Sequence, residues 1–205
     1  MLISHTRKFP RQLGTSLIEV LVTLAILSFA LLGIAGLQSK IGVAEMESYQ
    51  RSQALVALSQ MTERMTSNTA NAAAYVTAAP VGTGDAQPAD CTGIAPGPNR
   101  DLCEWSNTLK GTGETSGAGA SVGGMMAGRG CIAQVQAANP TLGTCTTGIY
   151  QVSVVWQGMA PTVAPVTAIP ALVPAIACGA GLYGGNDAYR RLVSATVSVA
   201  TTTCY

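Results

Sequence analysis

The sequence predicts an α+β fold in which one long amino-terminal helix packs on a small antiparallel β-sheet. Three observations lead to this prediction. A long apolar run lies near the amino terminus, a proline-free stretch of helical composition follows it, and two late segments alternate apolar with polar side chains. The apolar face of such a sheet needs a cover, and the predicted helix is the one long enough to provide it.

The composition excludes several classes of function. Of 205 residues, 48% are apolar and 10% are charged, with a net charge of +1. Disordered tails need high charge and few apolar residues, and nucleic-acid modules normally carry a basic face. The single histidine, His5, precedes the apolar run, so a chain that loses its first residues has no imidazole for catalysis or zinc binding. We therefore expect no enzyme, no metal, no cofactor and no nucleic-acid partner.

The apolar run extends from Leu17 to Leu37, and Glu19 is its only charged residue. From Val20 to Ser39 no charge occurs, and a helix of this length spans about 30 Å, the thickness of a bilayer's hydrocarbon core. Residues 1–14 contain basic but no acidic side chains. This asymmetry predicts a single-pass protein with a cytoplasmic amino terminus and a periplasmic remainder.

Three interpretations of this segment compete. A secretory signal could be cleaved at Gly33-Ile34-Ala35, but its apolar region would be unusually long and would contain an acid. A plain signal anchor fits the length but gives Glu19 no role. A carboxylate within lipid is costly and requires a partner, which the third interpretation supplies.

The stretch from Gly14 to Leu21, GTSLIEVL, resembles the class III leader of type IV pilins and pseudopilins. The resemblance implies that a prepilin peptidase cuts between Gly14 and Thr15 and that the new Thr15 terminus is N-methylated. It also implies that Glu19 meets the terminal ammonium of a neighbouring subunit during assembly. Two buried charges are tolerated when paired, whereas each alone is costly. Thr15 departs from the phenylalanine that is usual at this position of the family.

Further pieces resemble type IV pilus modification proteins, which are PilV-type minor pilins. These pieces are Leu31–Gln38, Tyr49–Ala54, Met61–Met65, Gly130–Ile132 and Tyr150–Gln157. The resemblance implies a pilin-like fold and a role in type IV pilus assembly or its initiation. The implied partners are the prepilin peptidase, the major pilin and other minor pilins, the pilus assembly platform and inner-membrane lipid.

Three alternatives stay open. A type II secretion pseudopilin has the same leader and a similar helix. A membrane-anchored periplasmic enzyme would work through carboxylates, with Asp101 beside Glu104 or Asp85 near Asp90. A tip adhesin would use the glycine-rich loop from Gly111 to Gly130.

The elements after the apolar run follow from periodicity and turn residues. Lys40 to about Asn68 should continue the helix without a break, with an exposed Glu47–Arg51 pair. Asn71–Asn99 reads as a loop and Asp101–Lys110 as a short helix. Strands are expected at Cys131–Val135, Tyr150–Gln157 and Leu192–Val199. The predicted inner face of the long helix consists of Ala44, Ser48, Leu55, Leu58, Thr62 and Met65. The predicted inner face of the short helix consists of Leu102, Trp105 and Leu109. The predicted solvent face of the second strand consists of Gln151, Ser153, Val155 and Gln157.

The predicted organisation has four parts: a leader at 1–14, a transmembrane and filament-core helix at 15–39, its amphipathic continuation at 40–74, and a head at 75–205. All six cysteines lie in the head, which indicates disulfides formed in the periplasm. Six cysteines allow 15 pairings. Nearest neighbours would give Cys91–Cys103, Cys131–Cys145 and Cys178–Cys204; a metal cluster is the alternative, but the sequence has no Cys-x-x-Cys pair.

Overall fold

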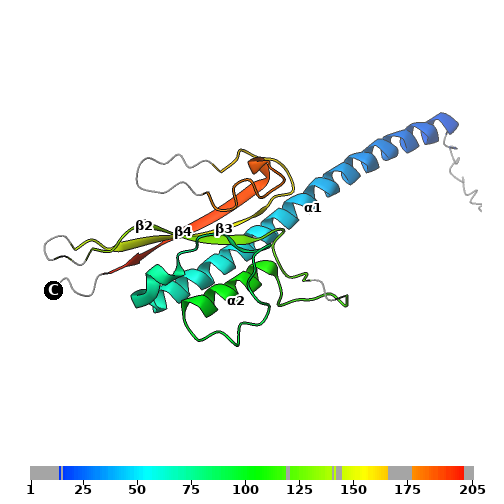
Figure 1. Cartoon of the computed structure of the whole chain (residues 1–205). Coiled ribbons are helices and arrows are strands. Elements are labelled where there is room, and N and C mark those ends of the chain that lie inside the picture. Colours follow the sequence, from blue (N-terminus) through cyan, green and yellow to red (C-terminus); the bar gives the residue numbers. More distant parts are fainter. Residues whose placement is uncertain are drawn as a thin grey trace, which may run out of the picture. The chain divides into compact units, whose positions relative to one another are not determined.

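A computed structural model describes residues 14, 16–118, 121–139, 141, 145–165 and 177–200. The chain divides into two compact units, Met1–Ala44 and Glu45–Tyr205. The second unit contains the predicted head at 75–205 together with the end of the long helix, and it is called the head from here on. One helix, α1 (Leu17–Ser67, 51 residues), runs through both units (Figure 1). No proline interrupts this stretch, and the predicted continuity of the helix to about Asn68 is confirmed.

The second unit contains a four-stranded antiparallel sheet in the order β1-β2-β3-β4 (Figure 1). Its strands are β1 (Val81–Gly82), β2 (Arg129–Gln136), β3 (Gly148–Gln157) and β4 (Arg190–Val199). The register places Tyr150 opposite Val197. A long helix on a small antiparallel sheet confirms the predicted α+β class, and the three predicted strands are β2, β3 and β4.

The head half of α1 packs on one face of the sheet. Its buried residues are Gln50, Ala54, Ala57, Leu58, Met61 and Met65. All of them except Gln50 share a core with Ile132 of β2 and with Val152 and Val154 of β3. The predicted inner face was correct at Leu58 and Met65, and Thr62 is partly buried. It was wrong at Leu55, which is 48% exposed, and at the exposed Ala44 and Ser48. The contact therefore combines small residues, Ala54 and Ala57, with large ones such as Met61 and Met65.

The prediction of a solvent-facing side on β3 is also wrong. Gln151, Ser153 and Val155 are all buried, while Gln157 is partly buried. Val155 on this face packs in a second, smaller cluster with Cys178 and Tyr183. The Cys131–Cys178 disulfide ties the covering segment to β2. Both faces of β3 are therefore largely buried, although apolar and polar residues alternate along the strand.

The helix α2 (Pro98–Lys110) ends at Gly111, which has φ 71° in the left-handed region. Its buried face includes Leu102, Trp105 and Leu109, as predicted. The preceding region is more ordered than the predicted loop. It contains the 3₁₀ helix η1 (Thr69–Tyr75) and strand β1, and a further 3₁₀ helix, η2 (Asp187–Tyr189), precedes β4.

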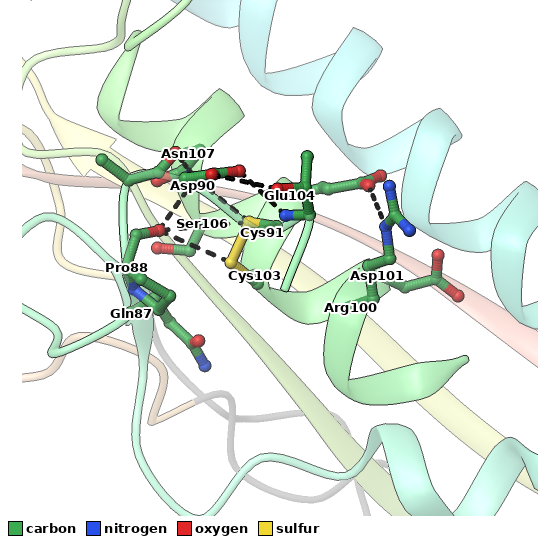
Figure 2. The surroundings of a disulfide bond; sticks show 12 residues. Gln87, Pro88, Asp90, Cys91, Arg100, Asp101, Cys103, Glu104, Ser106 and Asn107 are labelled. Atoms are coloured by element: carbon green, nitrogen blue, oxygen red, sulfur yellow. Dashed lines mark hydrogen bonds and ion pairs between the residues drawn. A yellow bond between two sulfur atoms is a disulfide. The ribbon is translucent and has the colours of Figure 1, made fainter. Parts of the chain in front are cut away.

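The disulfides only partly follow the nearest-neighbour pattern. Cys91–Cys103 forms as expected and joins the segment before α2 to that helix (Figure 2). The other two predicted pairs are wrong, because Cys131 bonds Cys178. Cys145 is also disulfide-bonded, and Cys204 lies outside the described residues. The expected Glu47–Arg51 pair is likewise replaced, since Glu47 binds the guanidinium of Arg191.

Candidate processing and assembly site

Gly14, the predicted cleavage position, is not crowded by other described atoms. Gly14 lies three residues before α1, and a Cβ placed on it would meet no atom within 4 Å. The first hydrogen bonds of the helix go to the Ser16 carbonyl, which accepts from the N–H groups of Glu19 at 3.0 Å and Val20 at 3.3 Å. Thr15 lies outside the described residues. Among the described residues, Gly14 therefore lies ahead of the hydrogen-bonded helix and contacts no distant part of the chain.

Glu19 stands in the first turn of α1 with its side chain exposed. No described residue forms a hydrogen bond or ion pair with its carboxylate. The free N–H groups of the first helical turn give that end a partial positive charge, which favours an anion there by about 0.3–1 kcal/mol. That contribution is small against the cost of burying an unpaired carboxylate. Glu19 therefore needs a cationic partner from outside the described chain if its surroundings become apolar.

The helix beyond Glu19 presents a long, exposed and mainly apolar surface. Every residue from Leu17 to Gly42 is exposed, and the large side chains Leu17 and Phe29 are 78% and 74% exposed. Exposing apolar area to water costs about 25 cal/mol per Å². Within the described chain, α1 is the one helix long and apolar enough to cross a membrane. This surface is consistent with membrane anchoring.

The two hydroxyl groups in the middle of the apolar run are satisfied within the helix. The Thr23 Oγ1 hydroxyl donates to the Val20 carbonyl at 2.9 Å, and the Ser28 hydroxyl donates to the Leu24 carbonyl at 2.8 Å. Polar groups in hydrocarbon must find partners within the protein. Glu19 is thus the one side chain of this run whose burial in an apolar environment would leave a strong polar group without a partner.

The carboxylates of the enzyme alternative occupy structural positions. Asp101 and Glu104 both accept hydrogen bonds from Arg64 Nη1 at 2.7 Å. The hydrogen bonds from Arg64 and Arg100 hold the pKa of Glu104 below its usual range. Asp85 forms an ion pair with Lys110. A general acid needs a raised pKa, so a lowered one favours a structural role for Glu104.

The ion pair between Glu47 and Arg191 was missed by the sequence reasoning. The two residues lie 144 positions apart. Arg191 also donates to the Ala160 carbonyl and the Thr162 hydroxyl, each at 2.7 Å. No local pattern marks such a contact, because it forms only when the end of β3 and the start of β4 meet the helix.

Comparison with known proteins agrees with this geometry. Residues 10–35 match the family model of the prokaryotic N-terminal methylation motif. The matched range includes Gly14, Thr15 and Glu19 and most of the apolar run. No curated protein and no solved structure matches the chain.

The motif and the fold together support a type IV pilin-like protein. The motif supports a pilin and a pseudopilin equally, because both carry this kind of leader ahead of a long apolar helix. The motif implies processing by a prepilin peptidase, and motif and fold together suggest a structural protein.

Proposed function

We propose that this chain is a PilV-type minor pilin that takes part in the assembly of a type IV pilus or in its initiation. The observation that carries the proposal is the methylation motif followed by an uncovered apolar helix with a single unpaired acid, Glu19. Four predicted parts underlie it: the leader 1–14, the filament-core helix 15–39, its continuation 40–74 and the head 75–205.

The proposed sequence of events begins in the inner membrane. The peptidase cuts after Gly14, and the new Thr15 ammonium is N-methylated. The apolar helix holds the subunit in the bilayer with the head in the periplasm. Transfer from lipid into a filament changes little apolar exposure, because lipid is as apolar as a neighbouring helix. Docking is therefore specified by helix packing and by pairing of Glu19 with the Thr15 ammonium of a neighbouring subunit, and the assembly platform drives extraction.

Several pieces that resemble PilV-type minor pilins contribute to the core of the head. Met61 and Met65 are fully buried and share a cluster with Ile132 and Tyr150. A Cβ on Gly130 would lie 2.3 Å from the Trp105 ring, so a glycine is needed there for Trp105 to pack. The resemblance therefore falls on residues that determine how helix and sheet fit together, which supports assignment to this group.

Processing is tested first. Gly14→Ala should leave the chain at its precursor size on a gel. Glu19→Ala should be cleaved normally but should be strongly depleted from sheared pili, because one buried charge then has no partner. Glu63→Ala, which removes an exposed acid from the head half of α1, is the matched control and should be incorporated normally. Normal incorporation of Glu19→Ala would refute the pairing.

The pseudopilin alternative makes a different prediction. Deleting a minor pilin should reduce surface pili and leave extracellular protein secretion intact, whereas deleting a pseudopilin should do the reverse. Counting pili by electron microscopy and assaying secreted protein in the same strain separates the two functions.

A further inference from the structure

A polar groove of about 490 Å³ opens on the head between α1, α2 and the glycine-rich loop that follows α2. Tyr49 and Gln53 come from α1, Asn107 comes from α2, and Glu114 comes from the loop. Sites for small ligands usually have volumes of about 300–1,000 Å³. All lining residues belong to the second unit, so the groove is complete within the head.

Part of the polar lining is already used by the protein. Glu104 accepts a hydrogen bond from Arg64 at 2.7 Å and another from Arg100 Nε at 3.0 Å, and Figure 2 shows the contact with Arg100. The charge of Arg100 is thereby matched by a carboxylate. Glu114 has no hydrogen-bond or ion-pair partner for its carboxylate among the described residues, so the groove carries a slight negative excess.

Other groups have spare hydrogen-bonding capacity. The Asn107 Nδ2 group donates to the carbonyls of Pro88 and Ala89, each at 3.0 Å, and this fixes the orientation of the amide (Figure 2). The Asn107 Oδ1 atom accepts no bond from any described group, but it is buried and therefore not open to a ligand. The Gln53 amide and the Tyr49 hydroxyl are also without partners in the described chain. The groove thus offers both donors and acceptors that the fold does not use.

The walls of the groove are held in place. The Cys91–Cys103 disulfide fixes the segment that lies beside α2. A Cβ on Gly111 would lie 1.9 Å from the backbone of Gly124, so the two ends of the glycine-rich loop press closely together. The Val122 N–H also donates to the Glu114 carbonyl at 2.8 Å. A preorganised site loses less entropy when a ligand binds.

We propose that this groove binds a neutral saccharide. Hydroxyl groups donate and accept at once, which suits the mixed set of the Tyr49 hydroxyl, the Gln53 amide and the Glu114 carboxylate. The ring of Tyr49 is 51% exposed and offers a flat apolar surface for the C–H face of a sugar ring. An acidic sugar would face the unpaired carboxylate of Glu114. An extended peptide normally places its side chains in separate pockets of the protein. The groove has few apolar side chains besides Tyr49 to form such pockets.

The inference does not depend on the proposed role in pilus assembly. A saccharide site on the head would add attachment to a filament subunit, and it can be measured on the monomer. Failure of sugar binding would leave the processing and incorporation tests unchanged. Failure of Gly14→Ala to block cleavage would equally leave the groove intact.

The test uses the full-length chain in a sugar-free detergent, lauryldimethylamine oxide, because glycoside detergents would compete. The chain is screened on immobilised hexose and N-acetylhexosamine di- and trisaccharides, with sialylated and uronate glycans and uncharged peptides alongside. The strongest neutral binder is then titrated by isothermal calorimetry. Neutral saccharides should bind, and acidic glycans and peptides should not.

Variants connect the binding to the groove. Tyr49→Ala and Glu114→Gln should each weaken binding by roughly tenfold, while Tyr49→Phe should keep most of it. Met46→Ala and Glu45→Gln are matched controls on the same helix, and they should bind as the wild type does. Unchanged thermal midpoints show that the variants are folded. Binding of acidic glycans or peptides alone, no binding of any neutral sugar, or full binding by Tyr49→Ala would overturn the proposal.

Discussion

The two halves of α1 share one backbone but have opposite surroundings. Between Leu17 and Gly42 no side chain is buried, whereas six residues between Gln50 and Met65 are buried in the head. The more apolar half is the one without a cover, and the half with charged side chains is the one that builds a core. Because an uncovered apolar surface is costly in water, the first half requires an environment that the described chain does not supply, either lipid or other helices.

The largest expected difference comes from truncating one residue in each half. Met61→Ala removes a fully buried side chain and should lower the free energy of unfolding of the head by about 2–5 kcal/mol. Leu24→Ala, at a residue that is 55% exposed, should change it by less than about 0.5 kcal/mol. Urea unfolding in detergent, followed by tryptophan fluorescence, measures both. Similar losses for the two variants would contradict the division of the helix.

The two disulfides whose cysteines are both described, Cys91–Cys103 and Cys131–Cys178, should differ in their contributions. Replacing Cys131 and Cys178 by serine opens a link with a sequence separation of 47, whereas replacing Cys91 and Cys103 opens one of 12. The entropy of loop closure predicts that the longer link contributes about 1 kcal/mol more, within a total of about 2–4 kcal/mol each. Thermal unfolding of the two double variants compares them directly. A larger loss for the shorter link would show that local packing outweighs chain entropy.

A buried carboxylate should make the head sensitive to acid. Burial alone would raise the pKa of Asp85, but hydrogen bonds from Lys110, the Gly82 N–H and Ser106 outweigh it and hold the pKa below its usual value. A lowered folded-state pKa stabilises the fold above the unfolded value of about 3.9, and this stability is lost as the pH falls through the folded-state pKa.

Asp85→Asn should therefore destabilise the head at pH 7 by about 1–3 kcal/mol, and it should lose less stability than the wild type below about pH 4. Unfolding curves between pH 7 and pH 2 give both quantities. Identical acid dependence in variant and wild type would rule out Asp85 as a source of that sensitivity.

The smallest effect is expected near the start of the head. The side chains of Glu47 and Arg191 are 30% and 14% exposed, and Glu47→Gln should cost about 1 kcal/mol or less. Glu45→Gln, at an exposed neighbouring acid, should have no measurable effect. The difference between the two variants should shrink in high salt, because salt screens ion pairs that are partly exposed. An equal effect of both variants would mean that the pair adds nothing to the head.

The features that the sequence predicted correctly depend on local patterns. The length of α1, the strand positions and the buried face of α2 follow from the order of apolar residues. The same holds for the motif around Gly14 and Glu19, which consists of adjacent residues. Features of this kind need no information about distant parts of the chain.

The features that were predicted incorrectly depend on distant parts of the chain. Val155 was predicted to face solvent because it alternates with apolar residues, but it packs against Cys178 and Tyr183 in a segment held by the Cys131–Cys178 disulfide. The disulfide itself joins residues that sequence proximity would not pair. The partner of Glu47 likewise lies on β4 rather than one helical turn away. In each case the determining contact forms only once the sheet has assembled.

The most direct test of the assembly account is the amino-terminal sequence and intact mass of the protein recovered from membranes and from sheared pili. The mature chain should begin at Thr15 and carry one added methyl group. A chain that retains Met1, or one trimmed beyond Ala35, would contradict it.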